Sequence, residues 1–171
     1  GAKYETAHPG AKLQFNFAAS GVLLQQISQG APVDLFISAD EAQMDVVAGQ
    51  VVSGTRRPLV RNQLAVAVAR DSARTVRAGG DLRDTSIRRI AIGDPYSVPA
   101  GVYARQWLEH VGLWSALQTR LLPTASVRAA LATVERGAAD AAIVYRTDLA
   151  TAPRARLAMV IAPPEGPVVV Y

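Results

Sequence analysis

Short apolar runs alternate with amphipathic segments along the whole chain. This alternation is typical of an α/β protein with largely parallel strands. The apolar runs predict strands at residues 13–17, 34–38, 58–69, 89–93, 120–123, 141–145, 157–162 and 168–171. The amphipathic segments between them predict helices at residues 21–29, 41–48, 102–111, 127–136 and 147–150.

The apolar run at residues 58–69 is longer than an ordinary strand of about 5–6 residues, and Arg61-Asn62-Gln63 interrupts it. A strand of this length can cross from one lobe of a protein to another. Residues 163–167 include three prolines, and this stiff, donor-poor stretch suits a second crossing. We therefore expect two lobes, residues 1–67 plus 163–171 and residues 68–162, with the ligand cleft between them.

Three of the predicted strand-to-helix turns end in small residues at a helix start. Ser20 stands where an N-cap belongs, Ala100 begins the helix after the second turn, and Val127 opens the helix after the third. Each turn taken alone is most simply a helix cap. Three helix N-termini at one cleft would instead form a pocket of hydroxyls and amides, which suits an ionised oxyanion such as sulfate, molybdate or phosphate.

Tyr145 ends the apolar strand at residues 141–145. A tyrosine at this position is either a rim aromatic with its hydroxyl in water or a hydrogen-bond donor into the cleft, and the pattern alone leaves both interpretations open.

The composition narrows the function classes. The chain has 171 residues, 50% of them hydrophobic and 19% charged, which is enough for a hydrophobic core. Its net charge of +4 comes from scattered cations with only 6% aromatic residues, which argues against nucleic-acid binding. The apolar runs fall far short of the roughly 18 residues that span a bilayer, so we expect no membrane insertion.

Catalytic and metal-binding patterns are lacking. The chain has no cysteine, and His8 and His110 are too few for metal coordination by histidine, cysteine or carboxylate ligands. No G-x-S-x-G, phosphate-loop or dinucleotide motif occurs, so we expect no enzyme. Asp34, Asp40 and Asp94 come at strand or turn ends, where such residues more often cap helices and close turns than act as general acids or bases.

Several segments taken in order resemble the periplasmic molybdate-binding proteins of molybdate ABC transporters. The resemblance covers nearly the whole chain with similar spacing. It is carried by residues 17–20 (Phe-Ala-Ala-Ser), 29–40, 92–95 (Ile-Gly-Asp-Pro), 98–104, 127–131, 134–136 and 143–145 (Ile-Val-Tyr).

The resemblance implies a type II periplasmic-binding fold with mixed, mainly parallel sheets, whose two lobes close on molybdate or tungstate. It implies that neutral donors hold the ion, namely the hydroxyl and amide of Ser20, the amides of Ala100 and Val127, and the hydroxyl of Tyr145. It further implies a periplasmic location, delivery of the ion to an ABC permease, and no cofactor. The alternatives are an oxyanion-sensing effector domain of a transcription regulator and a sulfate-type oxyanion-binding protein.

The chain departs from the family pattern at both ends. The resemblance implies that the first strand and the C-terminal helices are missing, with residues 3–8 as the tail of the first helix. The absent strand would lie beside residues 13–17 and 34–38. We therefore expect weak ion binding and self-association through exposed sheet edges.

Overall fold

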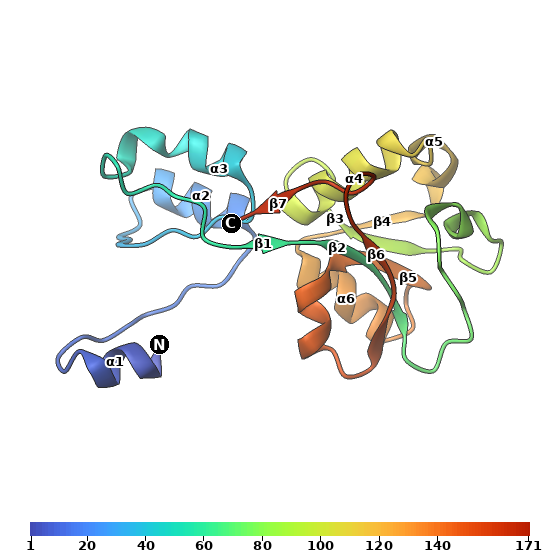
Figure 1. The fold of residues 1–171 in the computed structure, drawn as a ribbon, viewed down its shortest axis with the longest axis horizontal. Coiled ribbons are helices and arrows are strands. Elements are labelled where there is room, and N and C mark those ends of the chain that lie inside the picture. Colours follow the sequence, from blue (N-terminus) through green and yellow to red (C-terminus); the bar gives the residue numbers. More distant parts are fainter.

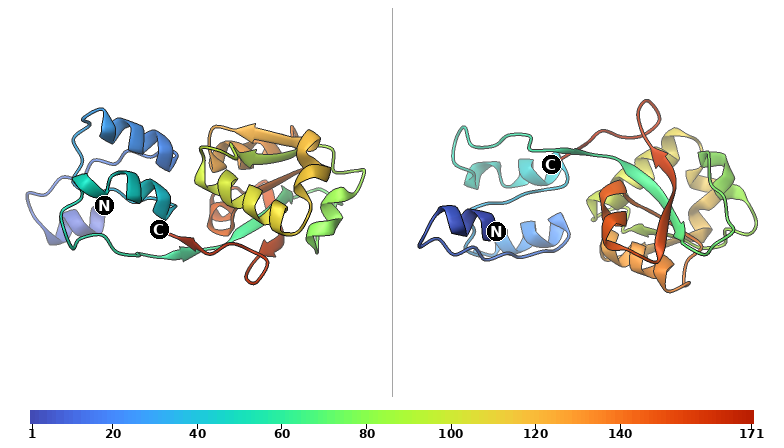
Figure 2. Two further views of the ribbon diagram at one scale, coloured as in Figure 1. Left: turned by 90° about the horizontal axis from the view of Figure 1, so that it is seen from above. Right: turned by 60° about the horizontal axis from the view of Figure 1, so that its bottom comes forward.

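The computed structural model describes all 171 residues and shows two lobes side by side (Figures 1 and 2). The large lobe comprises residues 64–161, and the small lobe comprises residues 1–60. Two extended segments join them, one running through β1 (Arg61–Asn62) into β2 (Leu64–Ala69) and one from β6 (Ala155–Ile161) to β7 (Val169–Val170). β1 and β7 pair antiparallel between the lobes.

The large lobe is built on a five-stranded mixed sheet with the order β4-β3-β5-β2-β6. Its remaining strands are β3 (Ile90–Gly93), β4 (Leu121–Thr124) and β5 (Ala141–Tyr145). β3 runs parallel to β4 and β5, whereas β2 runs antiparallel to β5 and β6. The α/β class and the mixed sheet predicted from the sequence are confirmed. The prediction of mainly parallel strands is wrong, because antiparallel ladders join β2 to both of its neighbours and only two of the four ladders in this sheet are parallel.

Helices cover both faces of this sheet. α4 (Pro99–His110) packs on one face in a core of 19 buried residues that includes Trp107 and Leu108. α6 (Val127–Glu135) packs on the other face in a second core of 10 buried residues. Every residue of β5 is buried, as expected for a central strand covered on both faces.

Short helical segments complete the large lobe. They are α5 (Trp114–Leu117) and the 3₁₀ helices η2 (Gly79–Arg83), η3 (Gln118–Arg120) and η4 (Arg146–Thr151). The helix predicted at residues 147–150 forms as η4, whereas the pattern did not predict α5 or η2.

The small lobe contains helices and no sheet. Its helices are α1 (Ala2–Ala7), α2 (Ser20–Ser28), α3 (Glu41–Val46) and the 3₁₀ helix η1 (Ala48–Gln50). The strands predicted at residues 13–17 and 34–38 are wrong, because residues 12–18 and 32–39 neither donate nor accept a backbone–backbone hydrogen bond. An extended segment without a partner cannot form a ladder, whatever its side-chain pattern.

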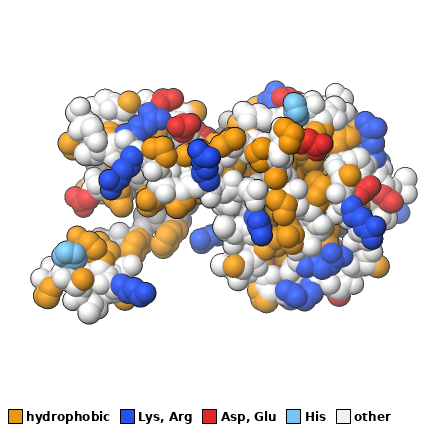
Figure 3. Space-filling model, viewed as in Figure 1, with side chains coloured by type: hydrophobic (Ala, Val, Ile, Leu, Met, Phe, Trp, Pro, Cys, Tyr) orange, Lys and Arg blue, Asp and Glu red, His pale blue; other side chains and the backbone are white.

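The apolar side chains of these two unpaired segments are largely exposed. Phe15 is 60% exposed, Phe17 is 73% exposed and Leu35 is 77% exposed. Hydrophobic side chains line the extended segment between α1 and α2 (Figure 3). Phe15 and Phe17 stack on each other with ring centroids 5.7 Å apart.

The first segment that crosses between the lobes is shorter than the apolar run at residues 58–69 that predicted it. The predicted polar break at Arg61-Asn62-Gln63 contains β1 itself, and only Gln63 separates β1 from β2. β2 pairs with β5 and β6 from Leu64 onward, so a boundary at residue 67 falls inside a strand of the large lobe. The first crossing therefore lies at residues 61–63, where the Asn62 side chain donates to Thr147 Oγ1 at 2.9 Å.

Candidate functional site

Ser20 lies at the first turn of α2, on the side of the small lobe that meets the large lobe. Ala19 is the N-cap, so the prediction that Ser20 caps the helix is wrong. Ser20 is buried, and its Oγ accepts a hydrogen bond from the Ala39 amide at 3.0 Å. The Ser20 hydroxyl donates to no protein acceptor, and neither does its amide. Both hydrogens are available to a ligand.

Ala100 lies at the start of α4, directly against the end of β3. Its side chain is buried and its amide donates to no protein acceptor. A Cβ built on the neighbouring Gly101 would lie 2.1 Å from Gly93 O and 2.4 Å from Asp94 O. Only glycine allows α4 to approach the strand this closely, and this approach fixes the position of the Ala100 amide.

Asp94 shapes the turn that precedes α4. Its Oδ1 accepts hydrogen bonds from the Tyr96 amide (3.0 Å), the Ser97 amide (2.9 Å) and the Ser97 hydroxyl (2.8 Å). The Ser97 hydroxyl and these amides lower the pKa of Asp94. The expectation of a structural role is confirmed for Asp94. It is also confirmed for Asp40, whose Oδ1 accepts from the Gln43 amide at 3.0 Å at the start of α3.

Val127 is the first residue of α6. Ser126 is the N-cap, and its Oγ accepts from the Ala129 amide at 3.1 Å. The Ser126 backbone is extended, with φ −163° and ψ 162°, so no hydrogen-bonded turn precedes the helix. The Val127 amide donates to no protein acceptor, as expected for the first turn of a helix.

Tyr145 ends β5 and is only 4% exposed, but its buried hydroxyl has no hydrogen-bond partner. Its ring meets the Tyr171 ring edge-on, with centroids 5.8 Å apart. Burial raises the pKa of Tyr145 well above its usual range and raises the pKa of Tyr103 to about 12. The Tyr145 phenol is therefore neutral at pH 7. Burial also raises the pKa of Tyr171, and the Tyr145 hydroxyl is close enough to oppose this shift but makes no hydrogen bond, so its O–H is available as a donor. A rim aromatic with its hydroxyl in water does not fit this burial.

Contacts between the lobes bring these elements together. A Cβ built on Gly21 in α2 would lie 3.1 Å from Ser97 O in the turn before α4. The Arg128 guanidinium of α6 lies 5.9 Å from the centroid of the Phe17 ring, three residues before Ser20. The first turn of α2 thus lies beside the turn leading into α4, and the segment before it touches α6.

The apolar core links the same positions. Ala100 and Tyr145 belong to one buried cluster, and Ala39 and Val127 pack against it. The Ala39 amide also donates a hydrogen bond to Ser20 Oγ, which links Ser20 to this cluster. The four predicted positions are therefore connected through one continuous set of contacts. A surface hollow of about 220 Å³, lined by residues of α4 and by residues 164–167, contains none of them.

Asp148 is a site neighbour that the pattern did not single out. One carboxylate oxygen is buried without a hydrogen-bond partner, and burial raises the pKa of this carboxyl, whereas Arg128 opposes the shift. Its charge also raises the pKa of Tyr145 and of Tyr171. The sequence spacing could have identified Asp148 as a neighbour of Tyr145. Asp148 follows Tyr145 by three residues, and residues three apart lie on the same side of a 3₁₀ helix.

The structure contains no group of three or more histidine, aspartate or glutamate side chains that could hold a metal ion. None of its helices combines the length and the apolar character required to span a bilayer. The four predicted positions supply hydroxyl and amide donors, and the Asp148 carboxylate lies near Tyr145.

The family model for bacterial extracellular solute-binding proteins matches residues 1–171. The chain is 41% identical over 139 residues to the molybdate-binding protein ModA of Escherichia coli, covering 78% of this chain and 54% of that protein. It therefore spans about half the length of that curated relative.

Solved structures show the same fold. The periplasmic molybdate-binding protein of Azotobacter vinelandii superposes with a TM-score of 0.84 at 26% identity, covering 99% of this chain and 75% of that one. The sulfate-binding protein SubI of Mycobacterium tuberculosis superposes with a TM-score of 0.78 at 15% identity, covering 99% and 67%, and this likeness concerns the fold alone. Since the fold agrees and the family model matches residues 1–171, the chain belongs to the bacterial extracellular solute-binding proteins and resembles their molybdate-binding members.

Proposed function

We propose that this chain captures molybdate or tungstate between its two lobes and passes the ion to an ABC permease in the periplasm, without a catalytic step. Ser20, Ala100, Val127 and Tyr145 supply the donors. The similarity to molybdate-binding proteins supports the ligand class.

The observation that carries the proposal is a set of unused neutral donors in one set of contacts. The Tyr145 hydroxyl is buried without a partner, and the amides of Ala100 and Val127 and the hydroxyl of Ser20 donate to nothing in the protein. A buried hydroxyl is normally paired, so the unpaired Tyr145 hydroxyl suggests a missing acceptor. The amides of Ala100 and Val127 are free because first-turn amides have no partner within the helix, which leaves them available to the same acceptor. An ionised oxyanion supplies several acceptor oxygens and needs no protein base.

Neutral donors also explain why no cation is required. Several aligned hydrogen bonds disperse the charge of a dianion, whereas a buried lysine or arginine would add its own desolvation penalty. Such donors do not distinguish two tetrahedral dianions by chemistry. We therefore propose that pocket size selects molybdate and tungstate over the smaller sulfate.

We further propose that this chain binds the ion weakly. Residues 12–18, which precede Ser20, and residues 32–39, which end at Ala39, make no backbone–backbone hydrogen bond. Ordering such segments around an ion costs conformational entropy and lowers the affinity.

Titration calorimetry at millimolar molybdate, tungstate and sulfate tests the proposal. The sharpest variant is Val127→Pro, because proline is well tolerated at the first position of a helix and follows the extended backbone of Ser126. It deletes the amide donor and also changes a side chain that packs against both cores, so Val127→Ala, which alters this packing but keeps the amide, serves as its control. Loss of one hydrogen bond to a charged ligand should weaken molybdate binding by about tenfold or more.

Tyr145→Phe provides the second arm, with Tyr96→Phe as its control because Tyr96 is 71% exposed. We expect molybdate and tungstate to bind and sulfate to bind far more weakly, with affinity reduced by Tyr145→Phe and unchanged by Tyr96→Phe. Equal affinity for all three anions, or equal effects of the variants and their controls, would refute the proposed site.

We also propose that copies of this chain associate through the unpaired segments. Extended backbone with unmet hydrogen bonds and exposed apolar side chains readily pairs with another chain. Analytical ultracentrifugation should show dimers that the substitution Leu35→Lys dissociates. Val52 is 73% exposed and lies outside these segments, so Val52→Lys is the control and should leave the dimers intact. A monomer at high protein concentration would rule this association out.

A further inference from the structure

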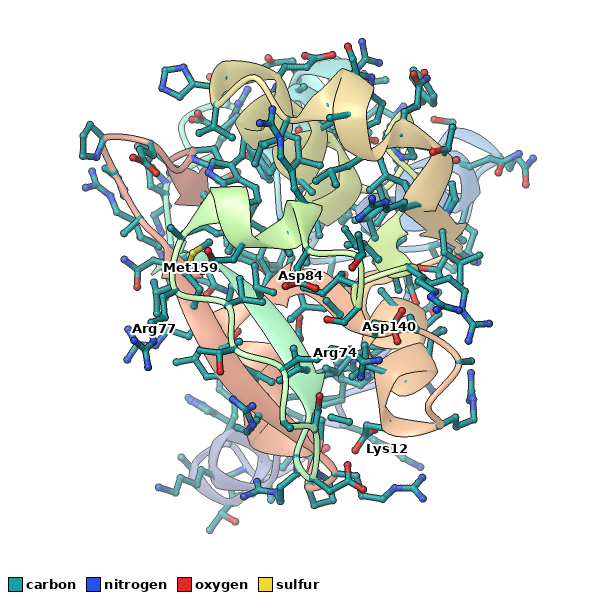
Figure 4. The ribbon with its side chains drawn as sticks, turned by 90° about the vertical axis from the view of Figure 1, so that its right-hand side faces the viewer. Lys12, Arg74, Arg77, Asp84, Asp140 and Met159 are labelled. Carbon is teal, nitrogen blue, oxygen red and sulfur yellow. The ribbon has the colours of Figure 1, made fainter.

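A basic hollow of about 340 Å³ lies at the end of the large lobe that faces away from the small lobe. It is lined by Arg74, Ser86, Arg88, Arg89 and Asp140. Figure 4 shows Arg74 and Asp140 near the middle of this end. Arg89 directly precedes β3 and Asp140 directly precedes β5, so the hollow lies at the N-terminal ends of these two parallel strands. Asp94 and Tyr145 lie at their C-terminal ends, on the opposite side of the lobe.

One arginine of the hollow is held rigidly. The Arg74 Nη2 lies 2.8 Å from Asp140 Oδ1, and its Nε donates to the Ser86 carbonyl at 3.0 Å. Asp140 Oδ2 accepts from the amides of Arg88 and Arg89 at 2.8 and 2.9 Å. Both oxygens of the only carboxylate lining the hollow are therefore occupied by protein donors.

The other two arginines have unused donors. The guanidinium groups of Arg88 and Arg89 are exposed and donate no hydrogen bond to a protein acceptor. Each guanidinium carries five N–H donors in a planar fork that matches two oxygens of a phosphate. Since Asp140 offsets one of the three lining arginines, two positive charges remain without a partner in the hollow.

Nearby charges leave this excess in place. Asp84 lies near Arg74 and Asp140 in Figure 4. Hydrogen bonds from Ser86 lower the pKa of Asp84 and keep this carboxylate ionised. Arg120 also acts on Asp84 and donates to three carbonyls around it, those of Arg83, Asp84 and Ile87. One added carboxylate and one added guanidinium cancel, so the region stays electropositive.

We propose that this hollow is a second anion site, which takes a phosphate group from solution or from a lipid headgroup. Arg88 and Arg89 grip the phosphate oxygens, and Arg74 presents a preoriented third cation. The site differs in kind from the one between the lobes, because its donors are charged and lie near water. Its binding should therefore weaken with salt and should not favour molybdate.

The first experiment follows backbone amide resonances of the full chain during titration with inorganic phosphate at low ionic strength. We expect saturable shifts at Arg88, Arg89 and Asp140. The double variant Arg88→Ala/Arg89→Ala should weaken phosphate binding by about tenfold or more. The control Arg57→Ala/Arg61→Ala removes the same charge from two exposed arginines elsewhere and should have little effect.

A second arm identifies the source of the phosphate group. Co-sedimentation with phosphatidylglycerol vesicles, competed by inorganic phosphate and compared with phosphatidylcholine vesicles, assigns the site to a lipid headgroup if only the anionic vesicles capture the protein. Phosphate binding without vesicle capture assigns it to free phosphate. Absence of saturable shifts at the hollow, or equal losses in the two double variants, would overturn the proposal. Tyr145→Phe should leave phosphate binding here unchanged, which separates this test from that of the site between the lobes.

Discussion

The two lobes carry similar apolar patterns but bury very different shares of them. Of the 41 buried residues, only four precede Leu64, and three of those four are polar. In the large lobe, five strands pair and helices cover both faces of the sheet. In the small lobe, the segments at residues 12–18 and 32–39 have the side-chain pattern of strands and no backbone partner. An apolar pattern thus marks where a strand can form, but hydrogen-bonded neighbours decide whether it does.

The strongest test compares two leucines, one from each lobe. Leu64 in β2 is fully buried, whereas Leu35 is 77% exposed. Leu64→Ala should lower the free energy of unfolding by about 2–5 kcal/mol through lost burial and a residual cavity. Leu35→Ala should change it by less than about 0.5 kcal/mol. Urea denaturation followed by circular dichroism measures both, and comparable losses would show that the small lobe buries its apolar residues after all.

The second test concerns close packing in the large lobe. Gly101→Ala would place a Cβ within 2.4 Å of two backbone carbonyl oxygens, so α4 must move away from β3. We expect a loss of about 1–3 kcal/mol in the free energy of unfolding. Gly80→Ala is the matched control, since its Cβ meets nothing within 4 Å, and it should leave stability unchanged or slightly raised. Identical denaturation curves for the two variants would contradict this packing.

The third test concerns the contact between the lobes. Gly21→Ala would bring a Cβ to 3.1 Å from Ser97 O, which is tight enough to push the lobes slightly apart. The urea midpoint should hardly change, because the contact lies outside the core of the large lobe. Molybdate affinity, measured by calorimetry, should fall by roughly threefold to tenfold. Gly49→Ala in the small lobe has open space around its Cβ and serves as the control. An unaltered affinity for Gly21→Ala would mean that the lobes need not touch here to bind the ion.

The smallest expected effect is the pH dependence caused by Asp148. Burial raises the pKa of this carboxyl in the folded protein above its ordinary value of 3.8. The folded state therefore binds its proton more tightly than the unfolded state does, and stability falls as the pH rises from below 3.8 through the raised pKa. Asp148→Asn should remove this fall and gain stability at neutral pH, within about 1 kcal/mol because the side chain is partly solvated. Denaturation series at pH 3, 5 and 7 compare the two proteins, and parallel curves would mean that Asp148 keeps an ordinary pKa.

Much of the large lobe could be predicted from local pattern. The strand at residues 141–145 forms with the expected bounds, and the helix predicted from Val127 begins at that residue. These elements are local because their apolar periodicity and cap lie within a few residues of each other. The 3₁₀ helix η2 and the short helix α5 carry too few residues for a periodicity to show.

Only part of the candidate site could be predicted from local sequence patterns. Strand-to-helix turns are visible in a sequence, so Ser20, Ala100 and Val127 stood out from their positions. The burial of the Tyr145 hydroxyl without a partner depends on Tyr171, more than twenty residues away, and on the cores around it. The lining of the hollow likewise joins Arg74 and Asp140 to the adjacent pair Arg88-Arg89 from separate parts of the chain.

By itself, the sequence determined the α/β class, the starts of α3 and α6, and the strand-to-helix turns whose residues can donate hydrogen bonds, because short-range periodicity and turn chemistry specify these features. Only the tertiary structure decided that residues 12–18 and 32–39 stay unpaired, that the lobes cross at residues 61–63, and that Asp148 lies at the edge of the donor set. The physical reason is that strand pairing, burial and the pKa of a buried group each depend on residues distant in the chain. A local sequence pattern does not specify which distant residues will lie next to it.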